Sequence, residues 1–241
     1  MSFVPGFGTL ARDYIRTGDA GLTADAFIHL PDLRARITHP EESLLRLTPE
    51  MFAMWERRAR AAGWPASWRL SDDEIEASRL NVLGDHPDGS DLWIFSYGSL
   101  MWDPGFHFAE VRLADVENHQ RRFTLKINLG RGSQDYPALM LSLEPQPGRC
   151  HGLAFRIAAP AVHAETAILW RREMLRGGYA PAMVPVTTPQ GPIAALAFVS
   201  NSCRRTAARR NRGCYREWQR RPRHQPRLSR ATGNAVAGAG D

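Results

Sequence analysis

Glu173 is the residue of this chain best suited to act as a base. It follows Val162, Thr166 and Leu169 at spacings of 4, 3 and 4, so it shares one face of a predicted helix with core-facing residues. A carboxylate in the last helical turn faces the negative end of the helix dipole, and partial burial also raises its pKa. These effects make Glu173 a candidate general base. The alternative is an ordinary surface ion pair with a neighbouring arginine, Arg171, Arg172 or Arg176.

A turn after an apolar strand is the second candidate feature. The strand that begins near Trp93 runs into Tyr97-Gly98-Ser99-Leu100, where Gly98 can adopt a positive φ. Consecutive backbone N–H groups exposed in such a turn form a concave site able to hold a carboxylate. Tyr97, Gly98, Ser99 and Leu100 are therefore candidate substrate-binding residues. The alternative is that this segment is only a turn, which is the commoner meaning of Tyr-Gly-Ser after a strand.

The sequence does not support metal or hydrolase chemistry. Its eight histidines form no H-E-x-x-H motif and no Cys/His cluster with zinc-like spacing. Cys150-His151 is typical of ordinary strand sequence. Ser99 is not expected to be a nucleophile, because G-x-S-x-G is absent and no motif places a histidine beside it. We therefore expect no bound metal.

The segment from Asp91 to about Asn201 has to position both features, and it is rich in predicted strands. Each strand is short, apolar or alternating, and bounded by glycine, proline or polar turns. The expected strands are Leu92–Ser96, Val111–Val116, Arg121–Asn128, Pro137–Leu143, Arg149–Ile157, Ala182–Thr187 and Ile193–Ser200. One helix is expected among them, from about Ala161 to Arg176, with Pro160 at its start and Gly177-Gly178 at its end.

Many short strands around one strong internal helix indicate an α+β fold. We expect a mixed sheet, curled or closed into a barrel, with flanking helices, rather than a doubly wound parallel sheet. Residues 1–90 are expected to be a helical extension and linker, and residues 91–201 the catalytic domain. Within the extension, Thr48 is a helix N-cap, Pro49 takes the first helical position, and the helix ends near Gly63-Trp64-Pro65. The turn formers of Gly84–Ser90 predict a linker.

The composition is that of a globular protein with a core of ordinary size. Of the 241 residues, 43% are hydrophobic and 23% are charged, which excludes bulk disorder and a membrane-spanning chain. Three cysteines without C-x-x-C spacing argue against a disulfide framework and favour a reducing compartment. The N-terminal residues lack a basic patch followed by an apolar stretch. We therefore expect a cytoplasmic protein with no membrane partner.

Positive charge is concentrated in residues 202–241. The net charge of +6 combines +9 there, from eleven arginines against Glu217 and Asp241, with −3 in residues 1–201. This tail has almost no apolar periodicity, so we expect it to be disordered or the product of a shifted reading frame. Lys126 is the only lysine, which indicates GC-rich coding DNA. A nucleic-acid partner is expected only through the tail, because the rest offers no basic stripe with interleaved aromatics.

Several sequence blocks, taken in order, resemble the ChaC-like γ-glutamylcyclotransferases, which release 5-oxoproline from γ-glutamyl compounds, notably glutathione. The resemblance covers about Asp91 to Asn201. Together the matching blocks look like those of the bacterial, glutathione-specific branch of the family. Its blocks are Trp93–Pro104, Arg121-Arg-Phe, Gly130-Arg-Gly132, Gly152–Arg156, Leu169–Met174 and Gly178-Tyr179. Several blocks in the right order and spacing are far more specific than any one of them.

The resemblance implies a mechanism without a metal or a cofactor. The Tyr97–Leu100 backbone would hold the α-carboxylate and α-amino end of the γ-glutamyl group, and Glu173 would take a proton from the α-ammonium. The freed amine would attack the γ-carbonyl, close a five-membered lactam and expel cysteinylglycine from glutathione. Tyr179 would hydrogen-bond the substrate or orient Glu173. Arg131 would meet a carboxylate at the far end of the substrate.

Two departures from the family pattern leave other functions open. Ser96 stands where the family usually has glycine before the tyrosine, and the arginine-rich tail replaces a proline-containing stretch and a helical segment. Neither the oligomeric state nor the preference among γ-glutamyl compounds is set by the sequence. The chain could be an inactive, truncated remnant of the family, or a nucleic-acid-binding protein that acts through its tail.

Overall fold

The computed structural model describes residues 24–61, 63–127 and 136–200, all of which belong to one compact unit. Its strands are β1 (Leu92–Ser96), β2 (Glu110–Ile127), β3 (Ala138–Ile157), β4 (Tyr179–Thr188) and β5 (Gly191–Ser200). Its α-helices are α1 (Pro49–Ala61), α2 (Asp72–Leu83) and α3 (Val162–Glu173). Short 3₁₀ turns occupy Ala24–Phe27, Pro31–Leu33, Pro40–Glu42, Ala66–Trp68, Ser99–Met101 and Ala159–Ala161. None of the described helices is both long and apolar enough to cross a membrane.

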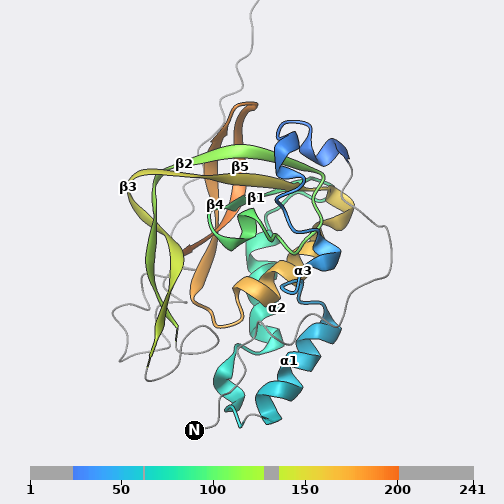
Figure 1. Ribbon diagram of the computed structural model, residues 1–241, viewed down its shortest axis with the longest axis vertical. Helices are drawn as coiled ribbons and strands as arrows, with labels where there is room; N and C mark the ends of the chain where they lie inside the picture. The colour runs from blue at the N-terminus through green and yellow to red at the C-terminus, as the bar shows by residue number, and fades with distance from the viewer. Residues whose placement is uncertain (1–23, 62, 128–135, 201–241) are drawn as a thin grey trace, which may run out of the picture. The chain divides into compact units, whose positions relative to one another are not determined.

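The five strands form a closed barrel in the order β1-β3-β2-β4-β5 (Figure 1). β5 closes it by pairing in parallel with β1, where Trp93 lies beside Ala195, while β1 and β3 are antiparallel. The predicted mixed sheet, closed into a barrel with flanking helices, is therefore confirmed. The seam between β2 and β4 is short, since its register within the described residues consists of the single pair Asp115 and Thr187.

β2 is one long strand where the sequence predicted two. The separate strands Val111–Val116 and Arg121–Asn128 are wrong, because the residues between them stay paired with β3. The register shifts between Glu117 and His119, and Asn118 there has a φ of 57°. Such an irregularity lets a strand bend without ending, so the polar residues that read as a turn lie at a bulge.

β3 is likewise one strand, and the predicted break between Pro137–Leu143 and Arg149–Ile157 is wrong. Pro145 lies opposite His119, directly after the register shift in β2. A proline is best tolerated in a sheet at an irregular position of this kind, where the regular ladder of N–H donors is already interrupted. The pairing with β2 therefore overrides the local turn formers. The other three strands match the sequence prediction to within three residues at each end.

The helices agree in part with the sequence prediction. α1 begins at Pro49 as expected, and α3 begins one residue after the predicted start. α3 ends at Glu173 rather than at Arg176, and Gly177 has a φ of 59°, a left-handed conformation that suits glycine after a helix. Helix α2 was not predicted. Its N-terminus carries a complete capping box, in which Ser71 and Glu74 satisfy each other's backbone N–H groups.

One hydrophobic cluster joins the helices to the barrel. Helix α3 contributes Val162, Leu169 and the fully buried Trp170, and the strands contribute residues such as Ile94 and Phe155. Residues from the N-terminal part, including Ala26, Phe27, Leu47 and Phe52, belong to the same cluster. A second cluster, which includes Phe95, Val116, Val184 and Ala197, is formed mainly by the strands. The N-terminal residues therefore share a core with the barrel and with α3.

Candidate active site

The turn that follows β1 is stabilised by a short 3₁₀ helix over Ser99–Met101. The Met101 N–H donates to the Gly98 carbonyl at 2.9 Å, and the Asp103 N–H donates to the Ser99 carbonyl at 3.0 Å. The first N–H groups of such a turn, those of Ser99 and Leu100, have no acceptor within it. These N–H groups belong to the segment Tyr97–Leu100, which the sequence predicts to bind a carboxylate.

Gly98 reaches this geometry without a positive φ. Its φ is −139°, so the expectation of a left-handed glycine is wrong. A Cβ atom at this position would lie 3.4 Å from the Leu141 side chain, which is close to an ordinary contact. Leu100, the last residue of the predicted tetrapeptide, is only 6% exposed and packs in the hydrophobic core. It can therefore offer a ligand its backbone but not its side chain.

Glu173 is the last residue of α3, and its side chain is 13% exposed. Burial raises the pKa of this carboxyl above its ordinary value, whereas the nearby Arg172 guanidinium acts to lower it. The Arg172 Nε lies 3.1 Å from the Glu173 Oε1 atom. Glu173 thus does form an ion pair with a neighbouring arginine, as the alternative expected. This pair is largely buried, however, whereas the alternative expected it at the surface.

Arg172 connects the two candidate features. Its Nη2 donates to the Ser99 hydroxyl at 3.1 Å, and its Nη1 donates to the backbone carbonyls of Asp103 at 2.6 Å and Pro104 at 3.1 Å. The same guanidinium meets Glu173 through Nε. The turn after β1 and the end of α3 are therefore neighbours. From the sequence, Arg172 is expected only as an ion-pair partner of Glu173, and nothing in its local sequence indicates these contacts with the turn.

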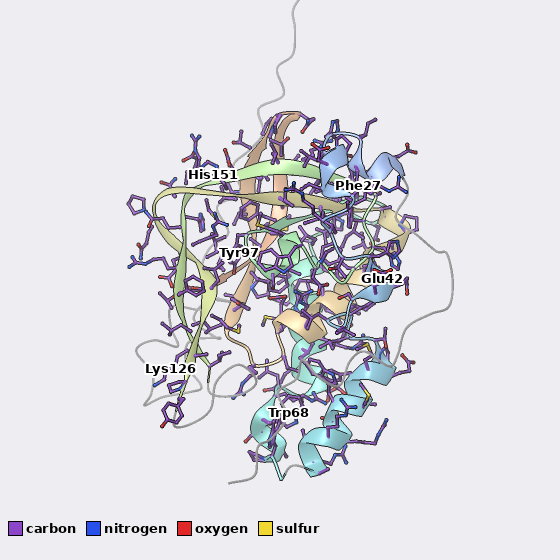
Figure 2. All side chains as sticks on the ribbon, in the orientation of Figure 1. Phe27, Glu42, Trp68, Tyr97, Lys126 and His151 are labelled. Carbon is purple, nitrogen blue, oxygen red and sulfur yellow. The ribbon has the colours of Figure 1, made fainter. Side chains whose placement is uncertain are left out.

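Tyr97 and Tyr179 lie beside Glu173. The Tyr97 hydroxyl donates to the Phe198 carbonyl at 2.6 Å, and the Tyr179 hydroxyl donates to the Leu141 carbonyl at 3.0 Å. Burial raises the pKa of both phenols, and the Glu173 carboxylate raises both further. Figure 2 shows Tyr97 deep among the side chains of the barrel. Both hydroxyls stay protonated at neutral pH and use their protons on backbone carbonyls, so toward a ligand their oxygen atoms can act as acceptors.

Ser96 precedes this site and is fully buried. Its hydroxyl has no hydrogen-bond partner among the described residues. An unpaired buried hydroxyl costs about 1–3 kcal/mol, so the hydroxyl of Ser96 lowers the stability of the folded state.

Arg131 and the arginine-rich tail, residues 202–241, are outside the described residues. Within the described ranges there is no group of three or more His, Cys, Asp or Glu side chains arranged to hold a metal ion.

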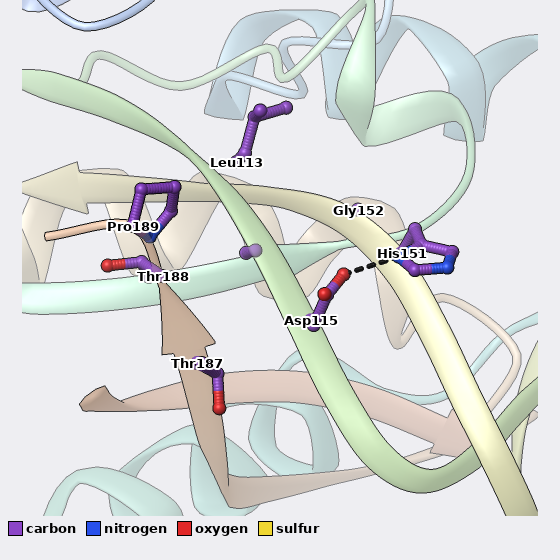
Figure 3. A pocket seen from close by; sticks show the side chains of 8 residues that line it. Leu113, Asp115, His151, Gly152, Thr187, Thr188 and Pro189 are labelled. Carbon is purple, nitrogen blue, oxygen red and sulfur yellow. Dashed lines mark hydrogen bonds and ion pairs between the residues drawn. The ribbon is translucent and has the colours of Figure 1, made fainter. Parts of the chain in front are cut away.

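A cavity of about 380 Å³ opens at the seam between β2 and β4 (Figure 3). It is lined by Leu113, Ala114, Asp115, His151, Gly152, Thr187, Thr188 and Pro189. In its lining, the Nδ1 atom of His151 on β3 lies 2.6 Å from Oδ1 of Asp115, its partner on β2. None of the candidate residues of the Glu173 site lines this cavity, so it is a separate feature.

Residues 92–208 match the family model described as "ChaC-like protein". The chain is 35% identical over 130 residues to the glutathione-specific gamma-glutamylcyclotransferase of Escherichia coli (strain K12), a match that covers 54% of this chain and 56% of that protein. It is 36% identical over 117 residues to the glutathione-specific gamma-glutamylcyclotransferase 1 of Mus musculus, covering 47% of this chain and 52% of that protein. The chain thus spans about half the length of the curated relatives it matches.

Among solved structures, the chain is similar to a glutathione-specific γ-glutamyl cyclotransferase from yeast. The sequence identity is 17% and the TM-score 0.42, and the match covers 46% of this chain and 69% of that chain.

Proposed function

The chain belongs to the ChaC-like family through residues 92–208, and from this premise we propose that it is a γ-glutamylcyclotransferase that cleaves glutathione to 5-oxoproline and cysteinylglycine. The family membership and the names of two curated relatives support the reaction and the substrate. The contacts around Glu173 support the assignment of roles to individual residues. The protein acts on a small molecule in the cytoplasm.

The reaction is an intramolecular transfer. Glu173 accepts a proton from the α-ammonium of the γ-glutamyl group, and the resulting amine attacks the γ-carbonyl carbon. A C–N bond forms in the lactam, and the original γ-amide C–N bond breaks. The protonated Glu173 returns its proton to the leaving nitrogen of cysteinylglycine. The attacking nitrogen loses a second proton as it becomes the lactam N–H, and this proton converts the released amine to its ammonium form, so no net proton is lost. Because both reacting groups belong to one molecule, this chemistry requires no cofactor or metal.

The turn Tyr97–Leu100 holds the α-carboxylate of the substrate. The N–H groups of Ser99 and Leu100 have no acceptor within the turn and are suited to an anion. The oxygen atoms of Tyr97 and Tyr179, whose protons are directed at backbone carbonyls, accept hydrogen bonds from the α-amino group. Arg131 meets the carboxylate at the far end of glutathione.

One observation carries the proposal. The Glu173 carboxylate and the Ser99 hydroxyl of the turn both contact the same guanidinium, that of Arg172, at 3.1 Å. The base and the carboxylate-binding turn therefore lie within the length of one γ-glutamyl group. Burial of Glu173 raises its pKa and so strengthens it as a base.

Incubation of the purified protein with glutathione, with 5-oxoproline and cysteinylglycine quantified, tests this function. The unaltered protein should form both products in equal amounts. Glu173→Gln should lower kcat by roughly 100-fold or more, since a general base contributes on this order. Glu117→Gln is the matched control, because the Glu117 side chain is 54% exposed and forms an ion pair with Arg149, whose side chain is 55% exposed. Activity should be unchanged in this control.

Two outcomes would contradict the proposal. No product from the unaltered protein would favour the alternative of an inactive family remnant. Full activity of Glu173→Gln would show that the protein catalyses the reaction without Glu173 as its base.

A further inference from the structure

We propose that Arg172 is the positioning residue of this site, which fixes the Glu173 carboxylate against the turn after β1. The inference rests on the proposed role of Glu173 as the base. It adds a residue whose contribution is made through another group rather than through the substrate.

The contact between Arg172 and Glu173 is unusual for consecutive helical residues. Side chains of neighbouring residues leave a helix roughly 100° apart and do not normally face each other. Here the Nε–Oε1 distance is nevertheless 3.1 Å. The two residues are the last of α3, where the helix ends and the Arg172 side chain is drawn toward the β1 turn. The pair is therefore set by tertiary contacts and not by helix geometry.

The guanidinium of Arg172 is held firmly by its other contacts. A guanidinium has five N–H groups in a rigid planar fork. Three of them donate to Ser99 Oγ, the Asp103 carbonyl and the Pro104 carbonyl, and the Nε–H group meets Glu173. The side chain is only 7% exposed. Two of these acceptors are backbone carbonyls, so the main chain of the turn fixes the position of the guanidinium. The guanidinium in turn fixes the position of the Glu173 carboxylate.

The neighbouring Gly105 leaves room for this arrangement. A Cβ atom on Gly105 would lie 3.2 Å from Arg172 Nη1, and the φ of Gly105 is +68°. A larger residue at this position would be strained and would press on the guanidinium. The turn is thus shaped to receive the arginine.

Charge provides the second part of the role. Burial alone raises the pKa of Glu173, which strengthens the base but reduces the fraction that is ionised and able to accept a proton. The Arg172 guanidinium opposes that shift, whereas the Tyr97 and Tyr179 phenols, which also interact with Glu173, are uncharged at neutral pH. Removal of the positive charge should therefore raise the Glu173 pKa further, and the acid side of the pH–rate profile should move to higher pH.

The variants Arg172→Gln and Arg172→Lys separate the two effects, and Arg171→Gln is the matched control. Arg171 precedes Arg172 on the same helix, carries the same charge, and forms none of the contacts with Ser99 or Glu173. Arg172→Gln should lower kcat about 100-fold with little change in KM, as expected for a misplaced base, and should shift the acid limb upward. Arg172→Lys keeps the charge but not the fork, so kcat should fall while the acid limb stays close to its original pH. Arg171→Gln should change neither.

A titration of Glu173 itself gives a readout that does not depend on activity. The ¹³Cδ resonance of Glu173 can be assigned as the signal lost in Glu173→Gln and then followed against pH. Its midpoint should be higher in Arg172→Gln than in the unaltered protein. If the unaltered protein forms no 5-oxoproline, the proposed function is wrong while this titration still decides the inference.

If the Glu173 titration midpoint is unchanged in Arg172→Gln and only the thermal stability is lower, Arg172 has a purely structural role and the proposal is overturned. Should Arg172→Gln fail to fold, Arg172→Lys still decides: kcat equal to that of the unaltered protein would refute the positioning role.

Discussion

Replacement of Glu165 by glutamine should lower the free energy of unfolding by about 3 kcal/mol at neutral pH and by much less in acid. Glu165 lies in the first turn of α3, and its side chain is 8% exposed. Its carboxylate accepts hydrogen bonds from Arg46 Nη1 at 2.7 Å and Nη2 at 3.0 Å, and from the His107 backbone N–H at 3.0 Å. The Nδ1 atom of His107 is 2.9 Å from the other carboxylate oxygen. This cluster joins the N-terminal segment to the helix that ends in Glu173.

The magnitude follows from the pKa of Glu165. Although burial favours the neutral acid, the contacts with His107 and Arg46 outweigh it and lower the pKa from 4.5 to about 2. Each pKa unit corresponds to about 1.4 kcal/mol, so the folded state gains about 3 kcal/mol from this group. Because the folded pKa is depressed, the gain is fully present above the unfolded value and is lost as the pH falls toward 2. At pH 3 about 1.4 kcal/mol should remain.

Urea denaturation of the unaltered protein and of Glu165→Gln at pH 7 and at pH 3 measures this dependence. The difference in unfolding free energy should be about 3 kcal/mol at pH 7 and roughly half that or less at pH 3. Glu117→Gln, which breaks an exposed ion pair, should cost at most about 1 kcal/mol. A Glu165→Gln difference that is the same at both pH values, or below about 1 kcal/mol at pH 7, would refute the explanation.

Two further predictions concern the backbone around Tyr97. Ser96→Ala removes a buried hydroxyl that has no partner among the described residues, so the unfolding free energy measured in urea should rise by about 1 kcal/mol; a loss of stability would show that the hydroxyl is paired. Gly152→Ala should destabilise by about 3 kcal/mol, because the new Cβ atom would lie 2.3 Å from the Ser96 carbonyl oxygen and force β1 and β3 apart. An alanine variant as stable as the unaltered protein would contradict that close contact.

The parts of the site that are encoded locally could be predicted from the sequence. The spacing of Val162, Thr166, Leu169 and Glu173 is a property of one helix, and all four are buried or nearly so. The strand before Tyr97 is equally local, since its apolar run and its end at a turn are visible in the residues themselves. Burial of Glu173 followed directly from its helical face.

Helix α2 was not predicted from the sequence because its buried face is not uniformly apolar. That face consists of Ile75, Ser78, Arg79 and Leu83, so hydrophobic periodicity does not reveal it. Arg79 can be buried because it donates to Glu76 and to the Thr166 hydroxyl on α3. The capping box formed by Ser71 and Glu74 is the sequence feature that could have predicted the start of this helix.

The contacts of Arg172 could not be predicted for a different reason. They join the end of α3 to carbonyls about 70 residues earlier in the chain, and such a meeting depends on the closed barrel rather than on a local pattern. The same holds for Gly98. Its backbone conformation is set by how the 3₁₀ turn leaves β1, and the presence of glycine alone does not determine the sign of φ.

The most direct test of the central claim, cyclisation within one substrate molecule, is the reaction with glutathione in H₂¹⁸O, followed by mass spectrometry. If the α-amine displaces cysteinylglycine, 5-oxoproline should form without ¹⁸O, and Glu173→Gln should form almost none. Glutamate carrying ¹⁸O in its γ-carboxyl group would instead show attack by water and would contradict the account.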